Sequence, residues 1–243
     1  MGAQTSISWT DHTFNLAWGC TKVSPACDHC YAETMATRWG FDVWGSDKSR
    51  RTFGDKHWNE PLKWNENAKK EGKRHKVFCS SMCDVFEKHP IIIQELKKLW
   101  PLIRQTPWLD WQLLTKHSNR IEMSLPSDWR QGYDNVWLGA TIENNDYCYR
   151  ADKLRVIPAK VHFISYEPAL GPLDKLDLIH IKWLIYGGES GGHYRKDDPQ
   201  WARDIRDRCE KSGTAFWYKQ TSALKPGDNP YLDGVQYYTF PST

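Results

Sequence analysis

Short runs of β-branched and aromatic residues recur along the 243-residue chain, and each run ends in a polar or glycine-containing turn. Runs of this kind are typical of buried strands. We predict strands near residues 14–18, 76–80, 111–115, 135–141, 160–165 and 182–186, with a seventh near 215–219. Residues 90–105 carry apolar side chains at helical spacing, and residues 31–38 also predict a helix. Strands that alternate with helices predict a parallel sheet.

The predicted fold is α/β, a full or partial (β/α) barrel, because polar residues and glycines follow almost every predicted strand. In such barrels ligands bind at the carboxyl ends of the strands. No linker or repeat divides the chain, so we expect one domain over residues 1–243. Residues 40–75 lack a strand pattern and are predicted to be an insertion after the first helix. This insertion is basic and includes Trp58 and Trp64, so it could track a phosphate backbone or form a solvated surface.

The composition narrows the possible partners and the compartment. The balance of 33 Lys+Arg against 30 Asp+Glu permits nucleic-acid binding without requiring it, and 14 tryptophans supply planar surfaces for stacking bases. No run of about 18 apolar residues occurs, so a membrane span is not expected. Seven cysteines without a secretory signal indicate a reducing compartment, the cytoplasm, where thiols are free or bind metal.

Three of the cysteines, Cys20, Cys27 and Cys30, lie in one loop directly after the first predicted strand. An odd number of thiols suits neither a disulfide framework nor a closed four-cysteine zinc site. It suits an iron–sulfur cluster in which one iron is left open to a small molecule. A zinc knuckle completed by His29 or by a distant ligand is the alternative.

With this loop the chain resembles the radical S-adenosylmethionine (SAM) enzymes, which carry three cysteines after the first strand of a partial (β/α)6 barrel. The spacing here is C-x6-C-x2-C instead of the more frequent C-x3-C-x2-C, and His29 lies where an aromatic residue usually approaches the adenine. Residues 19–33, 114–116, 167–168 and 187–191 resemble more closely a phage-associated family with a three-cysteine motif. The resemblance implies a [4Fe-4S] cluster on the three cysteines, SAM as cofactor, and an external electron donor. It also implies a 5′-deoxyadenosyl radical that abstracts a hydrogen atom.

Polar residues near the ends of the predicted strands and in the cysteine loop are the candidates for contact with cofactor and substrate. The candidates for SAM are His29, Tyr31, Ser80, Ser81, Asp84, Thr115, Lys116, Thr141, Glu143, Gly187 and Gly188. The catalytic or substrate candidates are Glu167, Glu189, Lys219 and Gln220, with Cys83 and Cys148 as hydrogen donors. Plainer interpretations stay open: Ser81 and Asp84 could cap the next helix, and Cys83 could pack in the core with Cys79 or complete a metal site. The others could be solvated loop residues.

We therefore predict a radical SAM enzyme, of isomerase or lyase type, that modifies a nucleic-acid base, with DNA favoured. One specific form is radical isomerisation of an amino-acid-modified thymidine in phage DNA, in the cytoplasm of a bacterial host. Reaction at a base within a duplex requires that the base be flipped out. The alternatives are a nucleic-acid repair enzyme with the same cofactors and a non-enzymatic, zinc-stabilised adaptor that binds nucleic acid.

Overall fold

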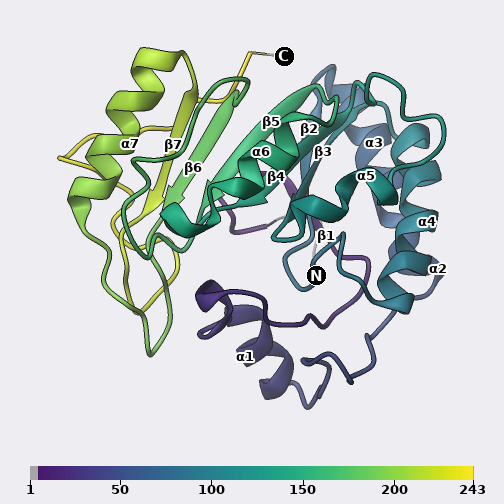
Figure 1. The fold of residues 1–243 in the computed structure, drawn as a ribbon. Helices are drawn as coiled ribbons and strands as arrows, with labels where there is room; N and C mark the ends of the chain where they lie inside the picture. The colour runs from purple at the N-terminus through teal and green to yellow at the C-terminus, as the bar shows by residue number, and fades with distance from the viewer. Residues whose placement is uncertain (1–4, 243) are drawn as a thin grey trace.

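The computed structural model describes residues 5–242, and its centre is a parallel sheet of seven strands in the order β1-β2-β3-β4-β5-β6-β7. The strands are β1 (His12–Phe14), β2 (His75–Cys79), β3 (Leu109–Thr115), β4 (Val136–Thr141), β5 (Val161–Tyr166), β6 (Trp183–Gly187) and β7 (Ala215–Gln220). Each strand pairs with the next one along the chain, which is the commoner arrangement for consecutive strands. The sheet curls into an open half-barrel (Figure 1), which confirms the predicted α/β partial barrel.

Helices cover the outer face of this sheet and leave its inner face open. The α-helices are α1 (Tyr31–Arg38), α2 (Asp55–Trp58), α3 (Glu60–Glu71), α4 (Pro90–Gln105), α5 (Ile121–Ser124), α6 (Tyr149–Arg155) and α7 (Pro199–Ser212). Short 3-10 turns are η1 (Pro25–Cys27), η2 (Ser118–Arg120) and η3 (Asn145–Tyr147). Helix α1 stands away from the helices that cover the sheet (Figure 1). None of the helices within residues 5–242 combines the length and the hydropathy that crossing a membrane requires.

The first strand lies earlier in the chain than predicted. The apolar run from Phe14 to Trp18 predicted a strand, but β1 ends at Phe14 because the residues after it pair elsewhere. The side chain of Asn15 accepts a hydrogen bond from the backbone N–H of Met82 at 2.7 Å. Trp18 forms an antiparallel bridge with Arg51. This run is therefore buried by the segments beside it and not by the sheet.

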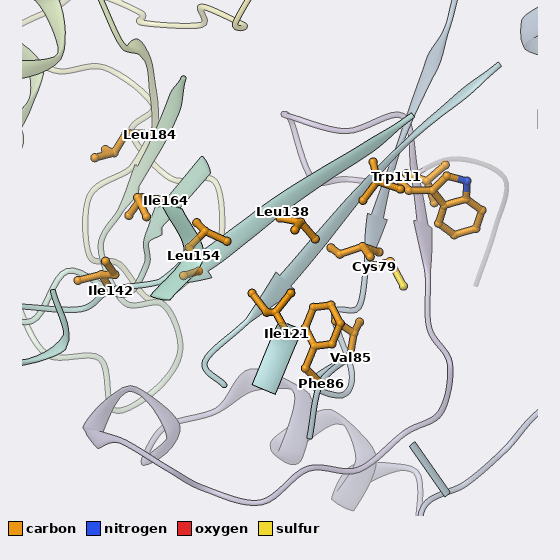
Figure 2. Packing of buried hydrophobic residues seen from close by; sticks show 14 of the residues in the cluster. Cys79, Val85, Phe86, Trp111, Ile121, Leu138, Ile142, Leu154, Ile164 and Leu184 are labelled. Carbon is orange, nitrogen blue, oxygen red and sulfur yellow. The ribbon is translucent and has the colours of Figure 1, made fainter. Parts of the chain in front are cut away.

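Side chains that point outward from the sheet form the larger core, between the strands and the helices (Figure 2). Trp111, Leu138, Ile164 and Leu184 belong to it, and each is fully buried. Cys79 lies among them with no exposed surface, and its burial raises the pKa of the thiol. Cys79 therefore packs as a core residue, which is the plainer of the two interpretations that the sequence left open.

Side chains that point inward change from aromatic to polar along the strands. The aromatic layer, here called the floor, comprises Trp9, Phe78, Trp137, Phe163, Trp183 and Trp217. Gly139 makes this packing possible, because a Cβ there would lie 2.3 Å from the ring of Phe163. Alternation along the strands places Ser80, Lys116, Thr141, Glu167 and Lys219 on the same inner side, nearer the carboxyl ends. This polar end is called the mouth, and it is where a ligand is expected.

The segment of residues 40–75 contains no complete strand, in agreement with its sequence pattern. Its helix α3 contacts β2 and β3, and Trp64 and Ala68 are buried in the larger core. Trp58 is partly buried and packs edge-on against Phe14. Trp58 and Trp64 therefore pack within the fold and stabilise it.

Candidate cofactor and substrate site

Residues 20–30, called the thiol loop, carry the three candidate cysteines and lead into α1, whose N-cap residue is Cys30. All three thiols are free and partly buried. Burial raises the pKa of Cys20 and of Cys30 above the ordinary thiol value. Because metals bind thiolates, loading this loop must release protons.

The arrangement of the thiols bears on which metal centre fits. Among the described residues, no three His, Cys, Asp or Glu side chains are grouped closely enough to hold a metal ion. Three thiols leave a four-ligand zinc site one ligand short, whereas an iron–sulfur cluster can bind three thiolates on separate irons and leave one iron open. The donor set therefore fits such a cluster.

A buried ion pair holds the amino-terminal end of the thiol loop. Arg50 donates to both carboxylate oxygens of Glu87, at 2.7 and 3.0 Å. The same guanidinium donates to the hydroxyl of Thr21 at 3.0 Å, next to Cys20. It also donates to the carbonyl of Val43 at 3.1 Å and to that of Lys48 at 2.8 Å. These carbonyls accept from the guanidinium N–H groups that Glu87 and Thr21 do not use. The buried ion pair therefore has hydrogen-bond partners for its donors.

A second ion pair holds the carboxyl-terminal end of the loop from the side of β6. Arg195 donates to Glu189 from its side chain at 2.5 Å and from its backbone N–H at 2.8 Å. Arg195 also donates to the carbonyl of Pro25 at 2.9 Å. The ring of His29 lies 3.1 Å from Glu189. Burial raises the pKa of Glu189, but the hydrogen bonds from Arg195 and His29 outweigh this and lower it below the usual range.

The carboxylate of Asp84 joins the ends of β2 and β3. It accepts from the hydroxyl of Thr115 at 2.6 Å and from the backbone N–H groups of Lys116 and Phe86 at 2.7 and 3.0 Å. Helix α4 is capped by His89, so the interpretation of Ser81 and Asp84 as caps of that helix is wrong. Asp84 instead fixes the direction in which Lys116 leaves its strand.

At the mouth, Lys116 and one oxygen of Glu143 present polar groups without a protein partner within residues 5–242. Lys116 forms no ion pair within the described part of the chain. Burial lowers its pKa, but Cys27, Glu143 and Cys30 nearby raise it above the ordinary value. Glu143 is fully buried; one of its oxygens accepts from Arg150 at 2.8 Å, and the other has no hydrogen-bond partner among the described residues. Buried polar atoms without partners are rare, so this oxygen indicates a ligand or an ordered water.

Glu167 and Lys219 form an ion pair on the other side of the mouth, with 2.7 Å between carboxylate and ammonium. Gly187 lies between them on β6, and a Cβ at this position would approach the carboxylate to 2.7 Å. Gln220 is turned away from the mouth: its amide donates to the carbonyl of Gly188 at 2.9 Å. A Cβ at Gly188 would lie 2.1 Å from the backbone of Ser222, so this glycine permits a close backbone approach.

The remaining candidates divide between the mouth and the outer face. Tyr31 donates to the carbonyl of Ser81 at 3.0 Å, which ties α1 to the end of β2. Ser80 and Thr141 are buried beside the mouth. Burial raises the pKa of Cys83 to about 11, and this thiol lies close enough to Cys20 to affect its titration. Cys148 precedes α6 near Arg208 of α7, on the outer face, so the structure does not bring it to the other candidates.

A separate hollow of about 1010 Å³ lies at the opposite end of the barrel. Its lining includes Lys182, Thr214 and Ala215, at the amino ends of β6 and β7, and the segment from Thr239 to Ser242. Neither the thiols nor the charged residues of the mouth line it. This hollow is open to solvent and lies away from the thiol loop, so it is not the candidate site.

Comparison with known proteins gives a family and a fold. The family described as "Protein of unknown function (DUF5131)" matches residues 4–235, nearly the whole chain. The protein belongs to this family. No curated protein matches the DUF5131 chain. The phage-associated resemblance is not confirmed by the family match.

The DUF5131 chain is similar in structure to spore photoproduct lyase. The lyase complexed with dinucleoside spore photoproduct is 14% identical with a TM-score of 0.53, and covers 86% of this chain. A mutant form of the lyase is 15% identical with a TM-score of 0.52 and covers 87% of this chain. The DUF5131 chain spans only 64% of the length of each of these structures. At this identity the likeness establishes the fold alone, a partial (β/α) barrel.

Three charged residues of the two ion pairs were not singled out in the sequence. Glu189 was a candidate, but Arg50, Glu87 and Arg195 were not. Arg50 lies in a run of basic residues that is typical of a solvated face. Arg195 follows the glycines at 191–192 in a segment with no motif. The position of Arg195 just after the Gly-Gly-Glu segment was the one feature of the sequence that could have indicated its place in the site.

Proposed function

We propose that this protein is a radical SAM enzyme that acts on a nucleic-acid base, with DNA as the favoured substrate. The observation that carries the proposal is the thiol loop, which presents three partly buried thiols at a polar barrel mouth. The fold supports it, because spore photoproduct lyase shares the fold and one of its structures holds a dinucleoside photoproduct. The likeness to the lyase favours base chemistry over the zinc-stabilised adaptor.

Cys20, Cys27 and Cys30 would hold a [4Fe-4S] cluster, and an external donor would supply the electron. When bound together, cluster and SAM supply reductive cleavage of a sulfonium bond, which yields a carbon radical. The chain's contribution is placement and exclusion of water. The two Arg–Glu pairs fix the thiol loop over the mouth, so a cofactor held there faces the inner side of the strands.

Lys116 and Glu143 fit the amino-acid end of SAM. The unpaired ammonium of Lys116 can donate to a carboxylate, and the unpartnered oxygen of Glu143 can accept from an ammonium group. Because Glu143 is fully buried, such a contact would be shielded from water and correspondingly strong. His29, Tyr31, Ser80 and Thr141 remain predicted contacts.

The reaction is of lyase or isomerase type. One candidate is radical isomerisation of an amino-acid-modified thymidine in phage DNA, with Cys83, buried near Cys20, as a candidate hydrogen donor. The second candidate is cleavage of a base lesion, and the likeness to spore photoproduct lyase favours it. Both need a base outside the duplex stack, since the mouth is formed by loops and strand ends around a closed floor.

The proposal is tested by SAM turnover. The protein is purified and reconstituted without oxygen, reduced with dithionite, and assayed for 5′-deoxyadenosine with and without single-stranded DNA. Cleavage of SAM that increases when DNA is added is the expected result. The Lys116→Met variant should bind SAM at least about tenfold more weakly, because a charged hydrogen bond is lost. A reduced cluster that never cleaves SAM would contradict the proposal.

A further inference from the structure

The ion pair of Glu167 and Lys219 lies within the mouth and is not used by the proposed cofactor contacts. The two side chains come from the end of β5 and from β7, on either side of β6, and their charged groups are 2.7 Å apart. The lysine side chain is 27% exposed and that of the glutamate 14%, so the pair is partly desolvated but reachable from the mouth. Ser165 adds a weak hydrogen bond to the carboxylate at 3.3 Å.

The backbone between the two residues is adapted to this pair. Gly187 of β6 has no side chain at the point where the carboxylate of Glu167 crosses the strand. Any Cβ there would lie 2.7 Å from the carboxylate oxygen and 3.0 Å from the Cγ of Glu167. A larger residue would therefore push the carboxylate out of its position beside Lys219.

A purely structural role does not account for these charges. The backbone ladder already joins β5, β6 and β7, through pairs such as Ser165 with Ile185 and Tyr186 with Tyr218. A partly exposed ion pair adds little to such a sheet. On the floor of the same barrel the inward positions are filled by aromatic side chains such as Trp183 and Trp217. Charges at the mouth are better explained by a ligand.

We propose that Glu167 and Lys219 read the hydrogen-bonding edge of the target base, an inference that rests on the proposed function. A carboxylate only accepts hydrogen bonds, and an ammonium group only donates them. The imide edge of thymine places an N–H donor next to a carbonyl acceptor, so it complements both members of the pair at once. A phosphate group would be attracted by Lys219 and repelled by Glu167, which favours a neutral base over the backbone.

The location of the pair agrees with this assignment. Glu167 follows β5 and Lys219 belongs to β7, whereas Lys116 and Glu143 follow β3 and β4. A base held by Glu167 and Lys219 would therefore lie beside the proposed cofactor contacts and not on them. Lys116 and Glu143 remain available for the cofactor.

The test compares two oligonucleotides. Binding of fluorescent single-stranded oligothymidylate to the intact protein is measured by anisotropy, together with the same oligomer built from N3-methylthymidine, which lacks the imide N–H. The wild type should bind the unmethylated oligomer about tenfold more tightly, because N3-methylation removes the imide N–H that would donate to Glu167. Lys219→Met and Glu167→Gln should each remove this preference.

Simple electrostatics predicts a different outcome. Loss of a positive charge should weaken the binding of both oligomers, and loss of a negative charge should strengthen the binding of both. Both variants lose the preference for the unmethylated oligomer only if Glu167 and Lys219 bind the edge of the base directly. Lys98→Met is the matched control, because Lys98 forms a Lys–Glu pair of the same 2.7 Å length with Glu95 on α4. This control should keep the preference.

A third variant, Gly187→Ala, displaces the carboxylate without removing a charge and should also reduce the preference. Circular dichroism of each variant verifies the fold. If the wild type binds oligothymidylate with a preference that both charge variants retain, the reading site is wrong and the proposed function stands. If the wild type binds neither oligomer, the nucleic-acid function and this inference both fail.

Discussion

The two ends of the thiol loop are held by Arg–Glu pairs of opposite character. The side chains of Arg50 and Glu87 are 0% and 4% exposed, whereas Arg195 is 34% exposed and its partner Glu189 is 4% exposed. Arg50 also donates to backbone carbonyls of residues 43–48, so it organises the chain around it. Arg195 reaches only one carbonyl of the loop, that of Pro25. The difference indicates that the amino-terminal end of the loop is part of the core. The carboxyl-terminal end should detach from the rest of the protein at a smaller cost in free energy.

The largest effect should come from Arg50→Met. This change leaves the carboxylate of Glu87 buried without its partner, which costs about 3–5 kcal/mol of unfolding free energy. Urea denaturation of the metal-free protein measures the loss. Arg104→Met is the control, since Arg104 pairs with Asp128 at the surface and should cost less than about 1 kcal/mol. Equal losses of unfolding free energy in the two variants would show that the buried pair does not stabilise the fold more than a surface pair does.

Arg195→Met should have a smaller and more local effect. After this change Glu189 keeps its contacts with the backbone N–H of residue 195 and with the ring of His29, so the expected loss of unfolding free energy is about 1 kcal/mol. Hydrogen exchange should become faster in residues 24–30 and stay unchanged in residues 20–23, which Arg50 holds. Faster exchange along the whole loop would contradict the division between the two ends.

The smallest effect concerns pH. The pKa of Glu189 is lowered in the folded protein, so its contribution to stability is complete above the ordinary carboxyl pKa and is lost as the pH falls through the lowered value. The difference in unfolding free energy between wild type and Glu189→Gln should therefore be largest near neutral pH and shrink below about pH 4. Denaturation curves at several pH values provide the measurement, and a constant difference would contradict this account.

The sheet and the mouth could be predicted because both follow from local patterns. Strand alternation places Lys116 and Thr141 on one side, and their position after the strands places them at one end. The contacts that hold the thiol loop could not be predicted, because they join segments that are distant in the chain. Arg50 lies 37 residues from Glu87. Arg195 and Glu189 are only six residues apart, but Arg195 lies 170 residues from Pro25, whose carbonyl it binds.

The sequence also could not separate the two candidate thiols for hydrogen donation. Cys83 and Cys148 both follow predicted strands by a few residues, and composition does not say which way each side chain points. The fold places Cys83 near Cys20 and Cys148 next to α7, on the outer face. The direction in which a loop leaves its strand depends on tertiary contacts such as those of Asp84.

The central claim is that Cys20, Cys27 and Cys30 hold an iron–sulfur cluster, and metal analysis tests it most directly. Iron and acid-labile sulfide are measured after anaerobic purification for the wild type, for Cys27→Ala, and for Cys148→Ala as the control thiol. We expect about four irons and four sulfides per chain in the wild type and in the control, and a large loss in Cys27→Ala. Zinc without sulfide in the wild type, or an unchanged cluster in Cys27→Ala, would contradict the claim.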